Sequence, residues 1–295
     1  MQAIIPHLWF DKEAKEATEL YTSLLPDSKV TNITTLQNTP SGDCEMVSFV
    51  LANQPFIAIS AGPFFKFNPS VSFHLKCQTK DEVDAIWQKL SPGSTVLMLL
   101  GSYPFSERYG WIEDKYGLSW QVIYVGDHEV QQRIMPALTF VGTVCGKAEE
   151  AITLYTSVFP NSKPLFFARY GTGAEPEREG TIQYGTFTLQ AMEFGAMDSA
   201  HNHRFAFNEA ISFVVLCETQ AEIDYYWEKL SADPQAEQCG WLKDRFGLSW
   251  QVCPTAFGEM MQHGTTEQIE RVTQAFLPMK KFDLATLERA YAGHA

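Results

Sequence analysis

Histidine, tryptophan and glutamine side chains lie in apolar runs of this chain, where they could contact a bound molecule. His7 and His74 fall in short apolar runs that predict strands. An imidazole on a strand can ligate a metal, carry a proton or form a buried hydrogen bond. Two tryptophan-rich segments add further candidates, which are Trp111, Trp120 and Gln121 in one segment and Trp241, Trp250 and Gln251 in the other.

Each of these residue types has a structural interpretation beside the functional one. Tryptophans, including Trp9 next to His7, could form an aromatic wall for a planar apolar ligand. They could equally fill the core of a small domain, where large aromatic side chains dominate. The two histidines could serve packing and hydrogen bonding alone. The sequence leaves both interpretations open.

The tryptophan segments belong to an internal repeat of three ordered blocks. Residues 20–29 recur at 154–163, residues 65–91 at 205–231, and residues 110–122 at 240–252. In the last block nine of 13 positions are identical. A repeat of this kind indicates duplication of a whole structural unit. We therefore expect a first domain over 1–127, a second over 133–256 and a helical tail over 257–295.

The order of elements within each copy predicts an α+β fold built of two βαβββ modules per copy. Apolar residues at helical spacing predict a helix over 12–25, with Asp11 as its N-cap. Thr79 and Thr219 each precede a glutamate by three residues, which is capping-box spacing for a helix in the second module of each copy. In the tail, Asp283 is the expected cap of the last helix, and the tail is expected to cover the second domain.

Composition narrows the class of protein. The 295 residues are 45% hydrophobic and 19% charged, as in globular proteins, and no apolar run is long enough for a membrane span. A formal charge of −13 argues against nucleic acid as a partner. The N-terminus carries no signal-peptide pattern, and the six cysteines form no CxxC pair, so we expect a cytoplasmic protein whose Cys77 and Cys217 are buried thiols.

Several segments together resemble a known family. These are the Pro-His-Leu-Trp-Phe-Asp run at 6–11, the helix with Tyr21 and the Pro-Asp-Ser after it, the Phe-Asn and Ser-Phe pairs at 67–73, and the block at 240–252. They resemble the PhnB-like family, labelled 3-demethylubiquinone-9 3-methyltransferase-like, of the vicinal oxygen chelate superfamily (glyoxalase I, bleomycin-resistance proteins and dihydroxybiphenyl dioxygenases). The resemblance implies tandem glyoxalase-like domains whose paired modules form curved mixed sheets around a cleft. It also implies a monomer with an internal pseudo-dimer, or a homodimer.

The resemblance also suggests where a metal would bind. Metal-dependent members place His, Glu or Gln ligands on inward-facing strands, with a carboxylate on the last strand of a module. Here that last-strand position holds Gln121 or Gln251, which bring no charge. The weak candidate set is His7, His74 and Gln121 in the first copy; its histidines are replaced by Ala137 and Val214 in the second.

Three functions follow from these observations. The first is binding of a small aromatic or quinone-like molecule in the sheet cleft, with no cofactor. The second is a metal-dependent lyase, isomerase or dioxygenase using a divalent ion. The third is the methyl transfer in the family's label, which needs a glycine-rich turn followed by a helix; Gly171 and Gly173 lie in a turn that no helical pattern follows.

Overall fold

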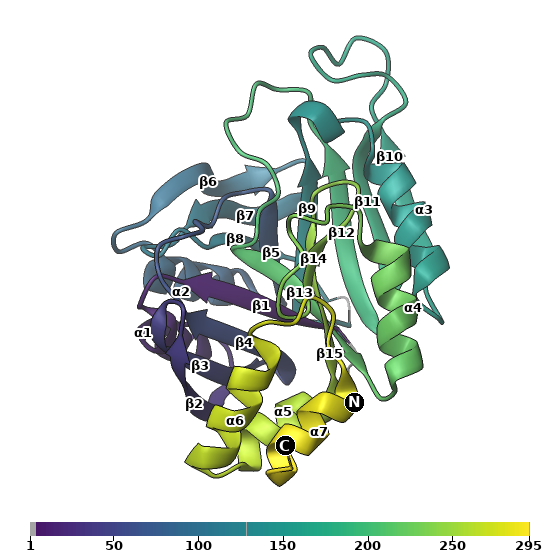
Figure 1. Cartoon of the computed structure of the whole chain (residues 1–295). Coiled ribbons are helices and arrows are strands. Elements are labelled where there is room, and N and C mark those ends of the chain that lie inside the picture. Colours follow the sequence, from purple (N-terminus) through teal and green to yellow (C-terminus); the bar gives the residue numbers. More distant parts are fainter. Residues whose placement is uncertain (1–3, 128, 295) are drawn as a thin grey trace. The chain divides into compact units, whose positions relative to one another are not determined.

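The computed structural model describes residues 4–127 and 129–294, and its elements form two compact units (Figure 1). Unit 1 combines the chain up to Lys66 with the chain from Asn208, and unit 2 spans Phe67–Phe207. Unit 1 contains β1 (Ile4–Phe10), α1 (Ala14–Thr22), β2 (Lys29–Thr39), β3 (Gly42–Leu51), β4 (Gln54–Ser60), β13 (Ile211–Cys217), α4 (Gln220–Leu230), β14 (Trp241–Lys243), β15 (Ser249–Pro254), α5 (Thr255–His263), α6 (Thr266–Phe276) and α7 (Leu284–Ala292). Unit 2 contains β5 (Val71–Cys77), α2 (Lys80–Leu90), β6 (Thr95–Tyr103), β7 (Ser106–Glu113), β8 (Ser119–Tyr124), β9 (Ile134–Phe140), a 3₁₀ turn η1 (Gly142–Val144), α3 (Ala148–Val158), β10 (Lys163–Arg169), β11 (Ile182–Leu189) and β12 (Met192–Asp198).

Each unit is built on one open, mixed sheet. Sheet A of unit 1 has the strand order β14-β15-β13-β1-β4-β3-β2, and sheet B of unit 2 has the order β10-β11-β12-β9-β5-β8-β7-β6. Parallel pairs such as β13–β15 and β5–β8 alternate with antiparallel hairpins such as β3–β4 and β7–β8. The α+β class and the mixed sheets predicted from the sequence are confirmed.

The spatial units divide the chain differently from the sequence repeat. Sheet A joins the first module of copy one to the second module of copy two, through antiparallel pairing of β1 with β13. Sheet B joins the other two modules through the equivalent antiparallel pairing of β5 with β9. The duplication therefore supplies two sheets, and each sheet takes one module from each copy.

Three of the four modules have the predicted βαβββ order, and the fourth does not. After α4 the chain forms only β14, three residues long, and β15. The stretch from Ser231 to Gly240 is ten residues shorter than its counterpart from Ser91 to Gly110, which forms β6 and the start of β7. The sequence prediction of four equal modules was wrong here, because the shortened loop cannot contain the β6 strand.

The C-terminal tail takes the place of that missing strand. In sheet B, Gly101 of β6 lies opposite Tyr109 of β7. In unit 1 the residue equivalent to Tyr109 is Cys239, whose N–H donates to the carbonyl of Met279 at 2.7 Å, and Gly240 N–H donates to Lys280 at 2.7 Å. The tail therefore pairs with the sheet edge through its own backbone, which satisfies donors that would otherwise be left open.

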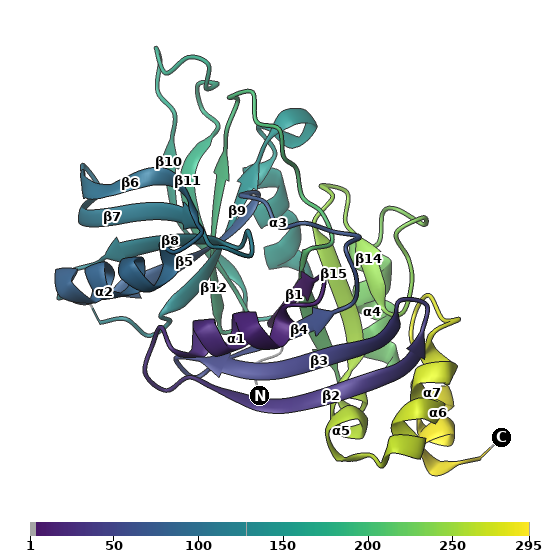
Figure 2. The ribbon, with the colours of Figure 1, turned by 90° about the vertical axis from the view of Figure 1, so that its left-hand side faces the viewer.

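The rest of the tail packs on one face of sheet A. Helix α6 contacts β2, and α5 contacts β2 and β15, whereas α1 packs on β3 and β4 (Figure 2). The buried tail side chains include Val272, Phe276 and Leu287, and they join one hydrophobic cluster with Leu36 and Val214. Since Leu36 belongs to copy one and Val214 to copy two, the tail covers a sheet shared by both copies. The prediction that it covers the second domain alone needs this correction.

Local sequence signals correctly predicted the N-caps of α2, α4 and α7. Thr79 and Thr219 accept hydrogen bonds from the backbone of Glu82 and Glu222, and Asp283 caps α7 through the N–H of Thr286, as predicted. Asp11 is not the cap of α1. The helix begins at Ala14, whose N–H donates to the hydroxyl of Ser60 at 3.1 Å, so a neighbouring strand supplies the cap.

The repeated tryptophan block forms the same buried turn in both units. Asp114 accepts from the backbone N–H groups of Tyr116 and Leu118, and its second oxygen accepts from the indole of Trp120 at 2.9 Å. Asp244 binds Trp250 at 2.9 Å in the same way. The repeated aspartate therefore organises the turn that leads into β8 in unit 2 and into β15 in unit 1.

Substitution of two glycines by alanine tests how closely the tail approaches the sheet. Both Gly240 (φ +83°) and Gly247 (φ +86°) have left-handed backbone, but a Cβ at Gly240 would lie 2.8 Å from the ring of Phe282, and one at Gly247 would meet nothing within 4 Å. We expect Gly247→Ala to cost about 1–2 kcal/mol from backbone strain alone. Gly240→Ala should cost about 1–3 kcal/mol more, because it also displaces the tail.

The measurement is urea unfolding of the two variants beside the wild-type chain. Equal losses of unfolding free energy for the two variants would show that the close approach of Phe282 contributes nothing to stability.

Candidate binding site under the C-terminal helices

The register of sheet A places side chains from distant parts of the chain on one face. His7 of β1 lies opposite Ser212 of β13, and Val214 of β13 lies opposite Gln251 of β15. Directly opposed residues point to the same side of a sheet. His7 and Gln251 therefore share the face that the tail covers.

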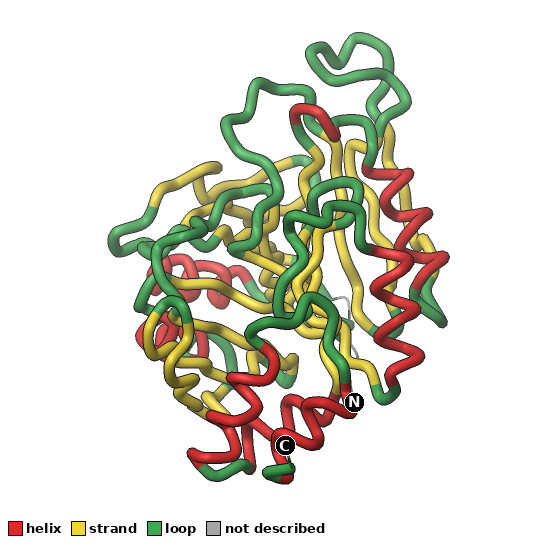
Figure 3. Tube along the Cα trace, viewed as in Figure 1, coloured by secondary structure: helices red, strands yellow, loops and turns green. Residues whose placement is uncertain are grey.

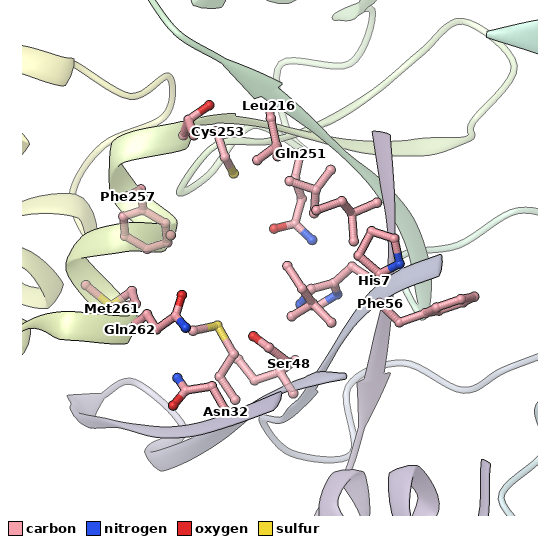
Figure 4. Close-up of a pocket in the computed structure, with 18 of the residues that line it drawn as sticks. His7, Asn32, Ser48, Phe56, Leu216, Gln251, Cys253, Phe257, Met261 and Gln262 are labelled. Carbon is pink, nitrogen blue, oxygen red and sulfur yellow. The ribbon is translucent and has the colours of Figure 1, made fainter. Parts of the chain in front are cut away.

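A cavity of about 360 Å³ lies between this face and the tail (Figure 4). Most of its lining is apolar or aromatic, with Met46, Ile59 and Leu216 on the sheet and Phe257 and Met261 on α5. The close-up shows Gln251 and His7 on one side of the space, Ser48 and Asn32 on another, and α5 opposite the strands. A mostly apolar lining with a few polar groups is typical of small-molecule binding sites.

His7 is the polar group with an unmet hydrogen-bonding need. Its side chain is buried and its Nδ1 atom has no hydrogen-bond partner. Burial lowers the pKa of His7 to about 3, so the ring is neutral near pH 7. The His7 side chain also lines the cavity, where a neutral imidazole can hydrogen-bond to a bound molecule. Gln251 beside it donates from Nε2 to the Ser212 hydroxyl at 2.9 Å.

Tryptophan rings line the cavity next to His7. The ring of Trp241 stands edge-on to His7 (centroids 5.3 Å apart) and to Trp9 (6.0 Å). In unit 2 the equivalent Trp111 donates to the hydroxyl of Ser119 at 2.7 Å, whereas the hydroxyl of Ser249 in unit 1 is buried without a partner. Trp241 thus contacts the cavity aromatics where its counterpart contacts a serine.

Sheet B carries corresponding buried polar side chains, and their hydrogen bonds differ from those on sheet A. Tyr109 donates to Gln121 Oε1 at 2.6 Å, and Gln121 Nε2 donates to the Ser72 hydroxyl at 2.8 Å. His74 stacks on Tyr184, and its Nε2 is buried without a partner. Burial and, to a smaller extent, the positive charge of Lys76 lower the pKa of His74 to about 3.

The structure therefore separates the residues that the sequence singled out. His7, Trp9, Trp241 and Gln251 line the cavity of unit 1. His74, Gln121 and Trp111 belong to sheet B of unit 2, and Trp120 and Trp250 are fully buried in the two cores. The cavity residues that sequence reasoning missed include Met46, Cys239, Cys253, Phe257 and Met261. Phe257 and Met261 lie in the predicted helical tail, and the sequence did not indicate that this part of the tail faces a cavity.

The donors present do not form a divalent-metal site. His7 is on sheet A and the other two members of the candidate set, His74 and Gln121, are on sheet B. Both ends of the Gln121 amide are occupied by Tyr109 and Ser72. Across residues 4–127 and 129–294 no group of three His, Cys, Asp or Glu side chains is arranged to hold an ion. The described side chains thus do not fit a metal held by three or four His, Cys, Asp or Glu ligands.

The glycines considered for a methyl-donor site lie in a loop. Residues 170–181 connect β10 to its antiparallel neighbour β11 without a helix, as the tube in Figure 3 shows. A nucleotide-type cofactor cradle needs a helix N-terminus after the turn. The loop has the wrong connection for that role.

The cysteines are all free of disulfides, and Cys77 and Cys217 are buried as predicted. Burial raises the pKa of Cys239, which lines the cavity, to about 11, and it raises the pKa of the neighbouring Cys253 as well. Thiols held protonated are weak nucleophiles. They therefore serve as apolar cavity wall.

The paired modules and their mixed sheets are those of the vicinal oxygen chelate fold. The chain belongs to the family described as 3-demethylubiquinone-9 3-methyltransferase, whose model matches residues 2–123 and again 132–253. None of the proteins with curated function matches the sequence.

Two solved structures are similar to this chain. A putative 3-demethylubiquinone-9 3-methyltransferase, PhnB protein, from Bacillus cereus is 37% identical, covering 42% of this chain and 100% of its own, with a TM-score of 0.40. Glyoxalase I from Zea mays is 10% identical over 89% of this chain and 98% of its own, with a TM-score of 0.56. The match with the maize protein spans most of both chains, and at that identity it shows the fold alone.

The buried neutral His7 predicts a pH dependence of stability. Because the folded pKa is lowered below 6.5, the unfolded chain binds the proton that the folded chain excludes. The neutral ring's full contribution is present above about pH 6.5 and is lost as the pH falls toward 3. Relative to His7→Gln, the wild-type chain should lose about 1 kcal/mol of additional unfolding free energy per pH unit between about pH 6 and pH 5.

Urea unfolding at the two pH values measures this difference. His74→Gln is the matched variant in unit 2, and its slope should change in the same direction for the same reason. Parallel pH profiles for wild type and His7→Gln would contradict a buried neutral His7.

Proposed function

We propose that this chain binds a small, flat, mostly apolar molecule of aromatic or quinone-like character in the sheet A cavity. The observation that carries the proposal is the neutral imidazole of His7 in the lining of an otherwise apolar cavity. A neutral imidazole can hydrogen-bond to a carbonyl or hydroxyl group. Trp9, Trp241 and Phe257 offer ring faces or edges to an aromatic body.

The size of the cavity fits this ligand class. Its volume of about 360 Å³ is at the lower end of the range of roughly 300–1,000 Å³ typical of small-molecule sites. Its lining includes Glu259 as an acidic residue and no Lys or Arg among the described residues. An uncharged ligand is therefore favoured over one that carries a phosphate or a free carboxylate group.

The proposal includes binding alone, without a bound metal and without methyl transfer. Support for leaving these out comes from the separation of His7 from the sheet B donors and from the loop that holds Gly171 and Gly173. The metal-dependent enzyme and the methyltransferase remain alternatives that the family relationship names, and no arrangement of side chains in either unit favours them.

We also propose a cellular compartment and an assembly state for this protein. No helix in the described part of the chain is long and apolar enough to cross a membrane. Six free thiols suit a reducing compartment, so we propose the cytoplasm. Because each sheet already joins one module from each copy, we propose a monomer with an internal pseudo-dimer, with a homodimer as the alternative.

Binding of a 2-alkylamino-1,4-naphthoquinone tests the proposal, since such quinones react slowly with protonated thiols. We expect the wild-type chain to bind it with quenching of tryptophan fluorescence and a rise in melting temperature that grows with ligand concentration. His7→Phe, which keeps an aromatic ring but removes the nitrogen, should weaken binding by about five- to ten-fold.

His74→Phe is the matched change on sheet B and decides between the two faces. Weakened binding in His74→Phe with unchanged binding in His7→Phe would move the ligand to unit 2 and overturn the assignment. Absence of binding by the wild-type chain across a panel of naphthoquinones and planar phenols would remove the ligand class itself.

A further inference from the structure

A second cavity in unit 1 adjoins the candidate ligand site. It has a volume of about 400 Å³ and lies between β2 and the turn that joins α5 to α6. Its lining comes from Asn32, Ile33, Thr34, Thr35, Gln37, Met261, Gln262, Gly264, Thr266, Ile269 and Glu270. We call it the outer groove, and the cavity that contains His7 the inner cavity.

The two spaces are separated by side chains that both of them share. Asn32, Met261 and Gln262 line the inner cavity and the outer groove alike. The backbone at this boundary is fixed, because the Thr34 hydroxyl donates to the carbonyl of Met261 at 3.1 Å. The side chains are adaptable: Met261 is an unbranched thioether and Gln262 is exposed. A ligand could therefore extend from one space into the other by displacing side chains alone.

The chemistry changes sharply at this boundary. The inner cavity is lined mainly by aromatic, aliphatic and sulfur-containing side chains, and the outer groove mainly by hydroxyl and amide groups. Thr266 is an exposed hydroxyl residue of the groove, and Asn32 and Gln262 are amide residues of its lining. Such groups pair with neutral hydrogen-bonding atoms of either polarity.

The charge of the groove lining narrows the class of ligand further. Among the described residues that line the groove, Glu270 is the ionisable one, and Asn38 donates to it at 3.1 Å. The chain as a whole carries a formal charge of −13. An anionic group in the groove would meet a carboxylate and an unfavourable overall field, whereas a hydroxyl or an ammonium group would not.

We propose that the outer groove is a subsite of the same ligand site and that the natural ligand is amphipathic: a flat apolar body for the inner cavity joined to a neutral or cationic, hydrogen-bonding arm for the outer groove. This inference rests on the proposed function, since it places the apolar body where that function does. It adds a ligand class that the inner cavity alone does not define.

A matched series of probes tests the inference. We would use 1,4-naphthoquinones substituted at the same carbon with a propylamino, hydroxypropylamino, aminopropylamino or sulfopropylamino arm, together with six-carbon homologues for reach. Dissociation constants come from tryptophan quenching at low ionic strength. The propyl probe reports on the inner cavity alone, and the others add one group to the end of the arm.

We expect the hydroxyl arm to bind about three- to ten-fold more tightly than the propyl arm, as one additional hydrogen bond allows. The ammonium arm should gain about a further two- to five-fold, which salt removes, and the sulfonate arm should bind more weakly than propyl. Glu270→Gln should abolish the advantage of ammonium over hydroxyl. Glu288→Gln makes the same charge change on α7, outside both cavities, and should retain that advantage.

The outcomes separate the two proposals. If no probe binds, the proposed function fails and the subsite fails with it. If the propyl probe binds and neither polar arm of either length improves on it, or the sulfonate arm binds best, the inner cavity stands and the outer groove is not a subsite. If Glu270→Gln and Glu288→Gln reduce ammonium binding equally, the effect is overall charge and the contact with the groove is disproved.

Discussion

The antiparallel pairing of β1 with β13 is the constraint on which the candidate site depends. It sets His7 opposite Ser212 and Ile5 opposite Val214, although these pairs are some 200 residues apart in sequence. The parallel pairing of β13 with β15 then sets Gln251 on the same face. Because strand side chains alternate with a period of two, a shift of one residue in the β1–β13 register would turn His7 away from the cavity. The site is thus a product of joining one module from each copy.

The duplication produced two equivalent sheet faces, and the shorter stretch after α4 in copy two makes them different. Copy two lacks the stretch that forms β6 in copy one, and the backbone donors of Cys239 and Gly240 are satisfied by the tail at Met279 and Lys280. The same tail then covers the sheet A face and supplies Phe257 and Met261 to the cavity. On sheet B, β6 keeps its position and no equivalent of the tail follows. Substitution at two positions completes the difference, since His7 and His74 correspond to Ala137 and Val214.

Much of the fold could be predicted from the sequence because its signals are local or repeated. Hydrophobic periodicity gave the helices, threonines and an aspartate gave the caps of α2, α4 and α7, and block repetition gave the duplication. Which module pairs with which could not be predicted, since modules of the same copy and of different copies carry the same pattern. Because the module pairing could not be predicted, the composition of the candidate site could not be predicted either. His7 and His74 look like partners in sequence, yet the strand pairing assigns them to different sheets. Trp120 and Trp250 resemble binding residues by type, and their buried bonds to Asp114 and Asp244 assign them to the core.

The central claim is that a ligand occupies the sheet A face beneath the tail, beside the neutral imidazole of His7. The most direct measurement is the ¹⁵N NMR spectrum of the chain labelled in its histidine side chains, recorded with and without a naphthoquinone ligand. The His7 signals are assigned by their loss in His7→Gln, and those of His74 by their loss in His74→Gln. The account predicts that ligand moves a ring-nitrogen resonance of His7 and leaves both nitrogens of His74 in place. A response at His74 with His7 unmoved would contradict it.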